Sequence, residues 1–535
     1  MHSTSTMNSK GIFNASIRDT VTLGLAVPGA AALGVLGAMA WAPGSSPWLL
    51  LPVFGGLCRL LARPRRPAPA ALLALAFGLG LHACGQAWMI AALFRETGLP
   101  PLLALLSAMA ATLYLAGFIA LPVYLCARCR LLATATPATS PGLTAAACLA
   151  ALLTAGEWAR GSLPGGFSSL SMGYAWLDTP LAGLLPVTGL YGLSFLAYVL
   201  CLGWLPVAES LVRRQYGPAV LGALAFAAFL ATAHWGAKQP WITPHGDLLG
   251  FRLIHTGTAQ QDKFSPEHIP AQIDRLAERL TQSPAQLVLA PETALPMFFH
   301  QLPAGLVDRL AQAARTHGSH FFIGVALMGG NQQAHNSLLH IPGDGTPLRF
   351  FAKEELMPFG EYSPPGFAWF SRHLHFPLKD LSPGPPGQPP FVADRRRLAA
   401  LICHEEASPR LARRRAMDAS VLLNPSNLAW FERSAAIPQG LAMARARALE
   451  TGRPVLRTTN AGGAAHIDHR GRIAGQVQPG QESDLTGEIR PMQGLTPYVR
   501  LGDTPVLLVC AAVLLLAAVR RKRAMSHPTI QEKTA

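Results

Sequence analysis

The sequence predicts a two-part fold: a multi-pass α-helical membrane domain of about eight spans, and an α/β domain inserted before the last span. Half of the 535 residues are apolar, only 14% are charged and the mean hydropathy is +0.28, so part of the chain is expected to lie in lipid. Long uncharged runs fill roughly the first 240 residues, whereas the later part is charged throughout, which indicates a polar domain after the membrane part.

Eight apolar segments are candidates for the spans. The uncharged stretch 20–58 is interrupted by Ala-Pro-Gly-Ser-Ser-Pro at 42–47, so we interpret it as two segments joined by a turn. The other six segments cover residues 70–94, 100–125, 143–156, 181–207, 218–235 and 504–519. We therefore expect a membrane domain of about seven helices over residues 20–237 and a last transmembrane helix over residues 504–519.

Basic residues cluster after the even-numbered segments, which fixes the expected orientation. The clusters are Arg59, Arg63, Arg65 and Arg66; Arg128 and Arg130; Arg213 and Arg214; and Arg520, Arg521, Lys522 and Arg523. By the positive-inside rule, the N-terminal tail (1–19) and the basic C-terminal tail (520–535) are cytoplasmic, and the polar domain faces outward. The net charge of +15 is thus a topology signal, and no basic patch interleaved with aromatic residues suggests nucleic acid.

Two charged residues, Glu157 and Arg160, stand one helical turn apart beside an apolar run. They could pair with each other or mark a lipid or substrate path, and pairing is the simpler interpretation.

Between residues 248 and 492 short apolar runs alternate with amphipathic stretches, which is typical of an α/β fold. The expected strands are 248–254, 286–290, 321–326, 336–340, 398–402, 420–423, 455–458 and 464–467. The expected helices are 266–281, 306–316, 410–417 and 438–451. Residues 381–390, rich in Pro and Gly, are expected to form a loop, and 361–381 a longer excursion.

Cys403 ends one of these strands and is followed by two carboxylates, Glu405 and Glu406. It is the only cysteine between Trp235 and Thr504. A buried, inert cysteine is the simpler interpretation of such a residue. However, a thiol with no disulfide partner in an outward-facing domain favours a function, and its place at a strand end makes it a candidate nucleophile.

Glu292 and Lys353 also follow apolar strands, which end at residues 290 and 352. Because strand ends of an α/β sheet converge on one edge, we expect both side chains to lie near Cys403. Glu292 can take the thiol proton as a general base, and Lys353 can lower the pKa of the thiol and stabilise an oxyanion. Each alone would be an ordinary surface charge; their joint placement predicts a nucleophilic site.

Motifs surround these residues in order along the chain. In the polar domain they are Ala-Pro-Glu-Thr-Ala-Leu-Pro (290–296), Lys-Glu-Glu-Leu-Met-Pro-Phe-Gly-Glu-Tyr (353–362), Ile-Cys-His-Glu (402–405), Ala-Trp-Phe (429–431) and Met-Ala-Arg-Ala-Arg-Ala-Leu-Glu-Thr-Gly-Arg-Pro (443–454). In the membrane part they are Glu-Trp-Ala-Arg-Gly (157–161) and Gly-Leu-Tyr-Gly-Leu-Ser-Phe (189–195). The polar domain resembles the nitrilase (carbon–nitrogen hydrolase) superfamily, and the whole chain resembles its membrane-embedded branch, the apolipoprotein N-acyltransferase family.

The resemblance implies an α-β-β-α sandwich over residues 248–492, in the periplasm, of a bacterial inner-membrane protein. It implies Cys403 as nucleophile, Glu292 as base and Lys353 as oxyanion stabiliser. Supporting or substrate-binding positions would be Glu361, Glu405, Phe264, His404 and Trp430.

The same resemblance implies a reaction. A membrane phospholipid would donate an acyl chain to the thiol, and the N-terminal amine of a diacylglyceryl-cysteine lipoprotein would receive it from the thioester. It implies no metal, no other cofactor and no nucleic acid, and the family precedent is a monomer.

The sequence departs from the family pattern around the site. The usual Gln-Gly-Asn is His-Thr-Gly-Thr at 255–258, which includes Thr256, and Phe264 stands where tryptophan is frequent. His404 replaces an aromatic residue, often Tyr, after the nucleophile; Leu428 replaces an aspartate; and Gly440 replaces a histidine. The triad is kept, so these departures concern the substrate more than the chemistry.

Three alternatives remain beside lipoprotein N-acylation. The chain could be a paralogue that modifies another exported protein, as in plasmid-transfer systems. It could be a membrane-tethered amidase with water as acceptor, or an assembly protein with a vestigial site.

Overall fold

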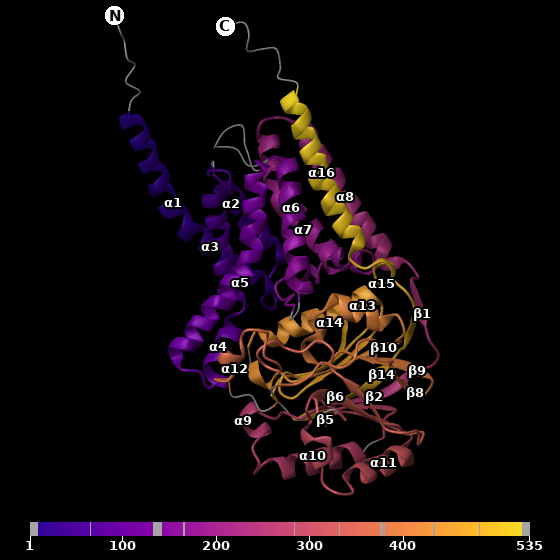
Figure 1. Cartoon of the computed structure of the whole chain (residues 1–535). Coiled ribbons are helices and arrows are strands. Elements are labelled where there is room, and N and C mark those ends of the chain that lie inside the picture. The colour runs from indigo at the N-terminus through magenta and orange to yellow at the C-terminus, as the bar shows by residue number, and fades with distance from the viewer. Residues whose placement is uncertain are drawn as a thin grey trace, which may run out of the picture.

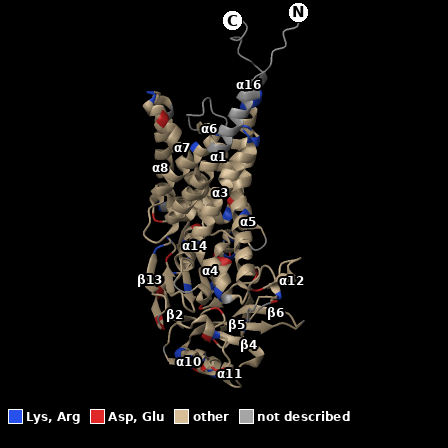
Figure 2. Cartoon of the chain, turned by 90° about the vertical axis from the view of Figure 1, so that its left-hand side faces the viewer, with Lys and Arg blue, Asp and Glu red and all other residues tan. Residues whose placement is uncertain are grey.

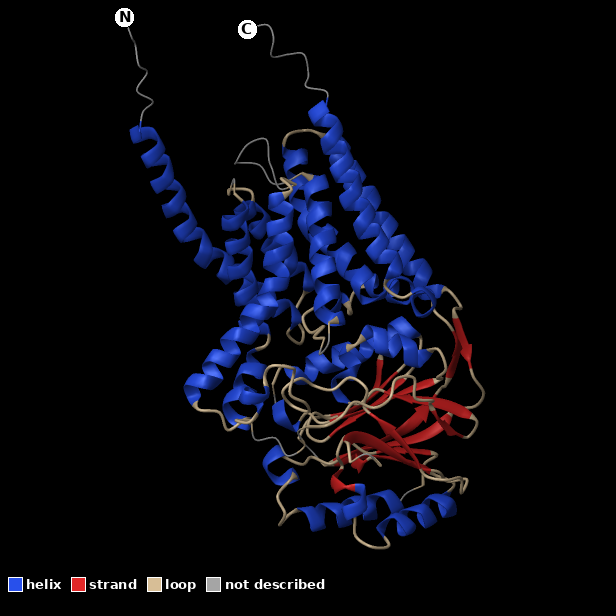
Figure 3. Cartoon of the chain, viewed as in Figure 1, coloured by secondary structure: helices blue, strands red, loops and turns tan. Residues whose placement is uncertain are grey.

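The structure is a computed structural model that describes residues 9–64, 66–131, 142–163, 166–282, 284–330, 332–374, 378, 380–431, 434–480 and 482–526. A bundle of helices forms one half of the molecule and an α/β domain forms the other (Figure 1). The strands lie in the α/β half (Figure 3). In chain order this domain stands between helices α8 and α16.

The bundle contains nine of the described α-helices. They are α1 (Ser9–Ala38), α2 (Leu50–Leu61), α3 (Pro67–Gly85), α4 (Ala87–Glu96), α5 (Pro101–Arg128), α6 (Leu143–Ser162), α7 (Leu185–Val212), α8 (Tyr216–Lys238) and α16 (Thr504–Ser526). The 3-10 helices η1 (Met39–Trp41), η2 (Pro47–Leu49), η3 (Met172–Trp176) and η4 (Pro180–Leu184) connect some of them.

Six helical stretches of the described chain are long and apolar enough to cross a membrane, which identifies a multi-pass membrane domain. They are Gly24–Trp41, Pro67–Gly85, Pro101–Arg128, Pro180–Val212, Ala219–Gly236 and Thr504–Arg523. The other two expected segments correspond to α2 and α6, which are not among the six. At 1.5 Å per residue, the 12 residues of α2 span only about 18 Å, less than the hydrocarbon core.

One expected segment is wrong in its extent. Residues 70–94 were expected to be continuous, but the chain breaks between α3 and α4 at Gln86, whose φ and ψ are −122° and 27°. Hydropathy does not register this break because the residues on both sides of it are apolar.

The α/β domain contains two large mixed sheets. The first has the order β14-β2-β3-β5-β6-β7, with β4 paired to β5. Its strands are β2 (Leu249–His255), β3 (Leu287–Leu289), β4 (Leu295–Phe298), β5 (His320–Met328), β6 (Ala334–Ile341), β7 (Arg349–Ala352) and β14 (Ser483–Ile489). Strands β2, β3 and β5 run parallel, and the outer pairs are antiparallel.

The second sheet has the order β13-β12-β11-β10-β9-β8, with β9, β10 and β11 parallel. Its strands are β8 (Phe391–Ala393), β9 (Arg396–Ala400), β10 (Val421–Ser426), β11 (Val455–Thr459), β12 (Ala464–Ile467) and β13 (Ile473–Val477). A separate pair is formed by β1 (Ile242–Pro244) and β15 (Met492–Gly494).

Alternation of side chains along the strands produces four layers. On β9, Leu398 and Ala400 point into the core between the two sheets. Ala399, and Leu401 just after the strand, point the other way and pack against the outer helices. Helices α10 (Ile269–Gln282) and α11 (Leu306–His317) cover the first sheet. Helices α13 (Pro409–Ala416) and α14 (Ala436–Thr451) cover the second. The domain is therefore an α-β-β-α sandwich.

The layer of α13 and α14 lies against the helical bundle, and the layer of α10 and α11 lies at the opposite end of the molecule (Figure 1). Met443 and Ala446 of α14 belong to the same buried cluster as residues of the bundle. The remaining short helices are α9 (Gln260–Lys263), α12 (Ala368–Ser371), α15 (Pro497–Leu501), η5 (Phe299–Gln301), η6 (Cys403–Ala407) and η7 (Ala429–Phe431).

Candidate active site

Glu292 lies in a turn directly after β3. The next residue, Thr293, has a left-handed φ of 47°. A Cβ at Gly324 of β5 would lie 2.3 Å from the carbonyl oxygen of Pro291 and 2.4 Å from the nitrogen of Thr293. Only a glycine at 324 therefore lets the Glu292 turn pack so closely against β5.

Lys353 follows β7 and is fixed through its backbone. Its N–H donates to the carbonyl of Asn336 on β6 (2.8 Å), and its carbonyl accepts from the N–H of Gly384 (2.7 Å). The lysine thereby continues the β6–β7 ladder, and its side chain is only 2% exposed. A buried ammonium needs anionic partners, and the site supplies them.

Cys403 begins η6, just past β9, and has a φ of 53°. This left-handed conformation costs a non-glycine residue about 1–2 kcal/mol, so the surrounding structure has to hold it. The Nδ2 of Asn424 on β10 does so by donating to the carbonyls of Leu401 (2.6 Å) and Cys403 (3.2 Å). The thiol is free and half-buried.

Glu292, Lys353 and Glu361 form a buried ion cluster. The Nζ of Lys353 lies 3.2 Å from Oε1 of Glu292 and 2.9 Å from Oε2 of Glu361. The other oxygen of Glu292, Oε2, accepts from the N–H of Asn427 (2.7 Å). One cation thus stands between two carboxylates, and the cluster carries a net negative charge that can accept a proton.

The charges of this cluster act on the thiol. Burial and the Glu292 carboxylate raise the pKa of Cys403, and the Lys353 ammonium opposes them. The resting thiol is therefore protonated at neutral pH and needs a base. Burial alone would lower the pKa of Lys353, but Glu292 and Glu361 raise it well above its usual value, so it remains an ammonium.

Glu405 links the nucleophile turn to the segment that follows Lys353. Its carboxylate accepts from the backbone N–H groups of Ile402 (2.6 Å), Glu354 (2.8 Å) and Glu355 (3.0 Å). Burial raises its pKa to about 7, while these donors and Lys353 lower it. Glu405 therefore sets the distance between the turns that carry Cys403 and Lys353.

The other three predicted supporting residues are His404 in η6, Phe264 directly after α9, and Trp430 in η7. His404 is half-buried, and burial together with the Lys353 ammonium lowers its pKa to about 3, so its ring is neutral. The ring centroid of Phe264, at the end of α9, lies 5.5 Å from Nζ of Lys263. Trp430 is half-buried in η7. Their part in catalysis stays a prediction.

Two departures from the family pattern have a steric explanation. A Cβ at Gly440 would lie 2.8 Å from both Nη2 of Arg457 and Oε1 of Glu406, so the glycine leaves room for their buried ion pair. Leu428 is buried, and a Cβ at Gly462 would lie 2.8 Å from its Cδ1. An apolar side chain at 428 thus packs where the family usually has an acid.

Three residues of the site were not predicted from the sequence. Nδ2 of Asn336 donates to Oε1 of both Glu292 and Glu361, at 2.6 Å each. The carbonyl of Glu292 accepts from Nζ of Lys263 (3.0 Å) and Nδ2 of Asn460 (3.0 Å). Strand register and turn geometry create these contacts. Of the three residues, only Asn336 could have been noticed in the sequence, because it is a polar residue within an expected strand.

The nucleophile turn touches the bundle directly. Oγ of Ser168 donates to the carbonyl of Ala407, the last residue of η6 (2.5 Å). Gln439 of α14 accepts from Nε1 of Trp88 (3.1 Å) and donates to the carbonyl of Gly85 (2.8 Å). The ring of Trp88 also packs edge-on against Phe431 at 4.8 Å. Helix α14 and η7 therefore pack directly against α3 and α4.

Glu157 and Arg160, both within the described chain, do not form the ion pair that we preferred. Glu157 accepts from the N–H of Met172 (2.8 Å) and the hydroxyl of Tyr198 (2.7 Å). Arg160 donates to Oγ of Ser171 (3.2 Å) and lies 3.5 Å from Nε2 of His82. Each residue holds a different part of the bundle, because the loop before η3 enters the space beside α6.

No group of three or more His, Cys, Asp or Glu side chains among the described residues has the geometry of a metal site.

An α-β-β-α sandwich with this thiol, base and ammonium, joined to apolar helices, defines a carbon–nitrogen hydrolase domain carried by a membrane domain. The carbon–nitrogen hydrolase family matches residues 256–496, and the apolipoprotein N-acyltransferase N-terminal domain matches residues 33–203. An apolipoprotein N-acyltransferase of Ralstonia nicotianae is 34% identical over 94% of this chain and 95% of its own length. One of Nitrosomonas europaea is 35% identical over 91% and 96%. The chain belongs to the apolipoprotein N-acyltransferase family.

Solved structures with a similar fold include Nit3 of Saccharomyces cerevisiae, a nitrilase-superfamily member. It is 16% identical, covers 56% of this chain and 99% of its own, and has a TM-score of 0.36. An amidase from Nesterenkonia sp. is 21% identical over 48% and 94%, with a TM-score of 0.35.

Proposed function

We propose that this chain N-acylates apolipoproteins, the reaction for which its relatives are named, and that a membrane phospholipid supplies the acyl chain. The acceptor is the free N-terminal amine of a diacylglyceryl-cysteine. Cys403 is the nucleophile, Glu292 the general base and Lys353 the oxyanion stabiliser, with Glu361 and Glu405 as supporting residues.

In the first half-reaction, the Glu292 carboxylate takes the thiol proton and the sulfur attacks the ester carbonyl carbon of the phospholipid. The carbonyl oxygen becomes an oxyanion, which the Lys353 ammonium stabilises. The C–O bond then breaks, and the leaving alkoxide takes the proton from Glu292. The products are a lysophospholipid and a thioester on Cys403.

In the second half-reaction, the lipoprotein amine attacks the thioester carbonyl and gives its extra proton to Glu292. The C–S bond breaks, an amide forms, and the departing thiolate recovers the proton from Glu292. The same base and ammonium serve both halves, so ping-pong kinetics are expected.

The contact between Ser168 and the carbonyl of Ala407 is the observation that carries this proposal. It joins the nucleophile turn to the membrane domain. A thiol held there is within reach of substrates anchored in the same membrane, whereas a freely soluble amide needs no such attachment.

We also propose the topology on which this depends. Residues 1–19 and 520–535 are cytoplasmic tails, residues 20–237 and 504–519 cross the inner membrane in about eight spans that include α2 and α6, and residues 248–492 form the periplasmic catalytic domain. Two contacts support it: Arg59 pairs with Glu209 at 2.8 Å, and Arg521 donates to the carbonyl of Cys129. The first contact joins the ends of α2 and α7, and the second joins those of α5 and α16. Lys and Arg side chains lie at the end of the bundle that points away from the α/β domain (Figure 2). We propose that the chain works as a monomer.

Complementation tests the function. A bacterial strain depleted of its own N-acyltransferase is given the wild-type chain or Cys403→Ala, and its lipoproteins are examined by mass spectrometry. Wild type is expected to convert diacyl to triacyl lipoprotein, and Cys403→Ala to convert none. With purified protein and phospholipid, wild type should gain an acyl thioester on Cys403 and release lysophospholipid.

Other outcomes identify the alternatives. A thioester without triacyl lipoprotein points to a different exported acceptor. Free fatty acid or ammonia release as the main product points to an amidase. Conversion by Cys403→Ala contradicts the proposed chemistry.

A further inference from the structure

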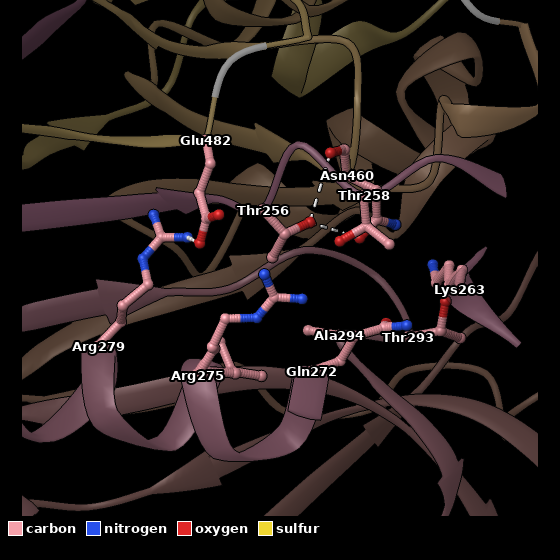
Figure 4. Close-up of a pocket in the computed structure, with 11 residues that line it drawn as sticks. Thr256, Thr258, Lys263, Gln272, Arg275, Arg279, Thr293, Ala294, Asn460 and Glu482 are labelled. Atoms are coloured by element: carbon pink, nitrogen blue, oxygen red, sulfur yellow. Dashed lines mark hydrogen bonds and ion pairs between the residues drawn. The ribbon is translucent and has the colours of Figure 1, made fainter. Parts of the chain in front are cut away.

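A pocket opens beside α10 on the first sheet, and Thr293, the residue after Glu292, lines it (Figure 4). Helix α10 lies at the end of the molecule farthest from the bundle (Figure 1). An occupant therefore arrives from water and not from the lipid. Its lining includes Lys263, Arg275, Arg279, Thr293, Asn460 and Glu482.

Two arginines of α10 line this pocket, one turn apart, and they differ in their partners. Arg279 is saturated: its guanidinium donates to Glu482 (2.9 Å), to Asp484 and to the carbonyl of Ser483 (3.1 Å). For Arg275 only a long contact is found, from Nε to the carbonyl of Ala271 (3.4 Å). Among the described residues, neither Nη atom of Arg275 has a partner.

The guanidinium of Arg275 lies below Thr256 and faces into the pocket (Figure 4). The one carboxylate that lines the pocket, Glu482, is already bound to Arg279. Two guanidinium groups, those of Arg275 and Arg279, face this one carboxylate, so the lining carries an excess of positive charge. A guanidinium with free Nη donors is suited to bidentate binding of a planar carboxylate or of a phosphate group.

The inner wall of the pocket belongs to the turn that carries the base. Nζ of Lys263 and Nδ2 of Asn460 each donate to the carbonyl of Glu292 at 3.0 Å, and Oγ1 of Thr293 donates to the same oxygen at 2.8 Å. Lys263 is 2% exposed, so little water competes for its ammonium. An anion in the pocket would meet the Lys263 side chain, which holds this turn through its Nζ.

We propose that this pocket binds a small oxyanion, a carboxylate or phosphate group, between Arg275 and Lys263. The group comes either from a free anion or from an acidic side chain of an exported protein. The proposal concerns binding and stands apart from the acyl-transfer function.

Full-length protein in detergent tests it, in both the wild-type and Cys403→Ala forms. The probes are sodium phosphate, sodium acetate, and a short blocked peptide with one Asp, each compared with sodium chloride of equal ionic strength. Binding is measured by calorimetry and by the shift in Tm. The matched variants are Arg275→Ala and Arg309→Ala, because Arg309 is an exposed arginine on neighbouring α11 and lies outside the pocket.

Saturable binding of at least one probe is expected, and Arg275→Ala should weaken it by roughly 10- to 100-fold, as loss of a charge-assisted hydrogen bond would. Arg309→Ala should bind like wild type, and Arg275→Lys should restore part of the affinity. Binding of the free anions or of the peptide alone distinguishes the source. The proposal is overturned if no probe binds beyond chloride, or if Arg275→Ala, folded with an unchanged Tm in chloride, binds as tightly as wild type. Binding in the Cys403→Ala form separates this result from any failure of acyl transfer.

Discussion

Asn336 stands between the two acids of the site, and its amide is their shared neutral donor. Without it, Oε1 of Glu292 and Oε1 of Glu361 would depend on Lys353 alone. Two carboxylates around one ammonium repel each other, and a hydrogen-bond donor between them offsets part of this repulsion. In the proposed mechanism, this arrangement holds the Glu292 carboxylate in place to take the thiol proton.

Asn336→Ala should therefore lower kcat by roughly 10- to 100-fold, because it removes hydrogen bonds to charged groups. Asn336→Asp should be worse, since it adds a third carboxylate and favours a protonated, inactive base. The measurement is single-turnover formation of the acyl thioester on Cys403. Equal rates for wild type and Asn336→Asp would show that the amide has no part in the site.

Lys263 predicts a dependence of stability on pH. Burial lowers its pKa to about 7, while Glu292 and Cys403 partly oppose the shift. Between pH 7 and the usual pKa of about 10.5, the unfolded chain binds more protons than the folded one. The contribution of Lys263 to stability therefore rises with pH over this window and is least favourable below pH 7.

Lys263→Met removes this titration, so the Tm of wild type minus that of the variant should increase from pH 6.5 to pH 9.5. Thermal unfolding of both proteins in the same detergent measures it. A difference that does not change with pH would show that Lys263 titrates normally in the folded protein.

At the residue scale, the sequence predicted the candidate catalytic residues but not the residues that hold them in place. Glu292, Lys353 and Cys403 could be selected because each follows an apolar strand. Lys263 and Asn460, whose side chains meet at one carbonyl, are 197 residues apart, and nothing local in either segment indicates that contact.

At the scale of elements, the break in α7 connects the two domains. Gly189 has φ 66° and ψ −178°, a conformation essentially restricted to glycine. The break frees the N–H of Leu190 from the helix, and Glu450 of α14 accepts it at 2.7 Å. Nε of Arg447 also lies 2.8 Å from Oε2 of Glu450, so the two fully buried charges form an ion pair.

Gly189→Ala should destabilise the protein by roughly 2–4 kcal/mol, because the left-handed backbone is strained and the new Cβ would lie 2.3 Å from Cε2 of Tyr498. A fall in Tm of several degrees is expected. Gly117→Ala in α5 is the matched control, since its Cβ would meet nothing within 4 Å. Equal Tm values for the two variants would contradict the role given to the break.

The elements that sequence patterns predicted are those with one clear periodicity. The eight expected strands and four expected helices of the α/β domain are all present, with ends shifted by a few residues. Strands β13 and β14 were not predicted because their exposed faces interrupt the apolar alternation. The edge strands β1, β8 and β15 are only three residues long and leave no pattern.

At the scale of the whole molecule, the arrangement of the two domains depends on contacts between segments hundreds of residues apart. Gln439 and Gly85 are one such pair, separated by 354 positions. Six of the eight segments selected by hydropathy correspond to helical stretches of the described chain that are long and apolar enough to cross a membrane, and the basic clusters gave an expected direction. Neither pattern indicated that α14 would contact the bundle. Helix α14 is buried on two faces, one against the second sheet and one against the membrane helices, so its sequence shows no face reserved for the bundle.

The direction of the chain in the membrane is the last prediction. Arg213 is exposed at the basic end of the bundle, and Glu278 is exposed on α10. With the exposed Cys84 and Cys129 and the half-buried Cys403 changed to Ser, Glu278→Cys should react with a membrane-impermeant maleimide in intact spheroplasts. Arg213→Cys should react only after the membrane is permeabilised, because the positive-inside rule puts it in the cytoplasm. Both variants have to react fully in detergent for the comparison to hold. The reverse pattern would put the thiol in the cytoplasm, away from exported lipoproteins, and would overturn the proposed function together with the topology.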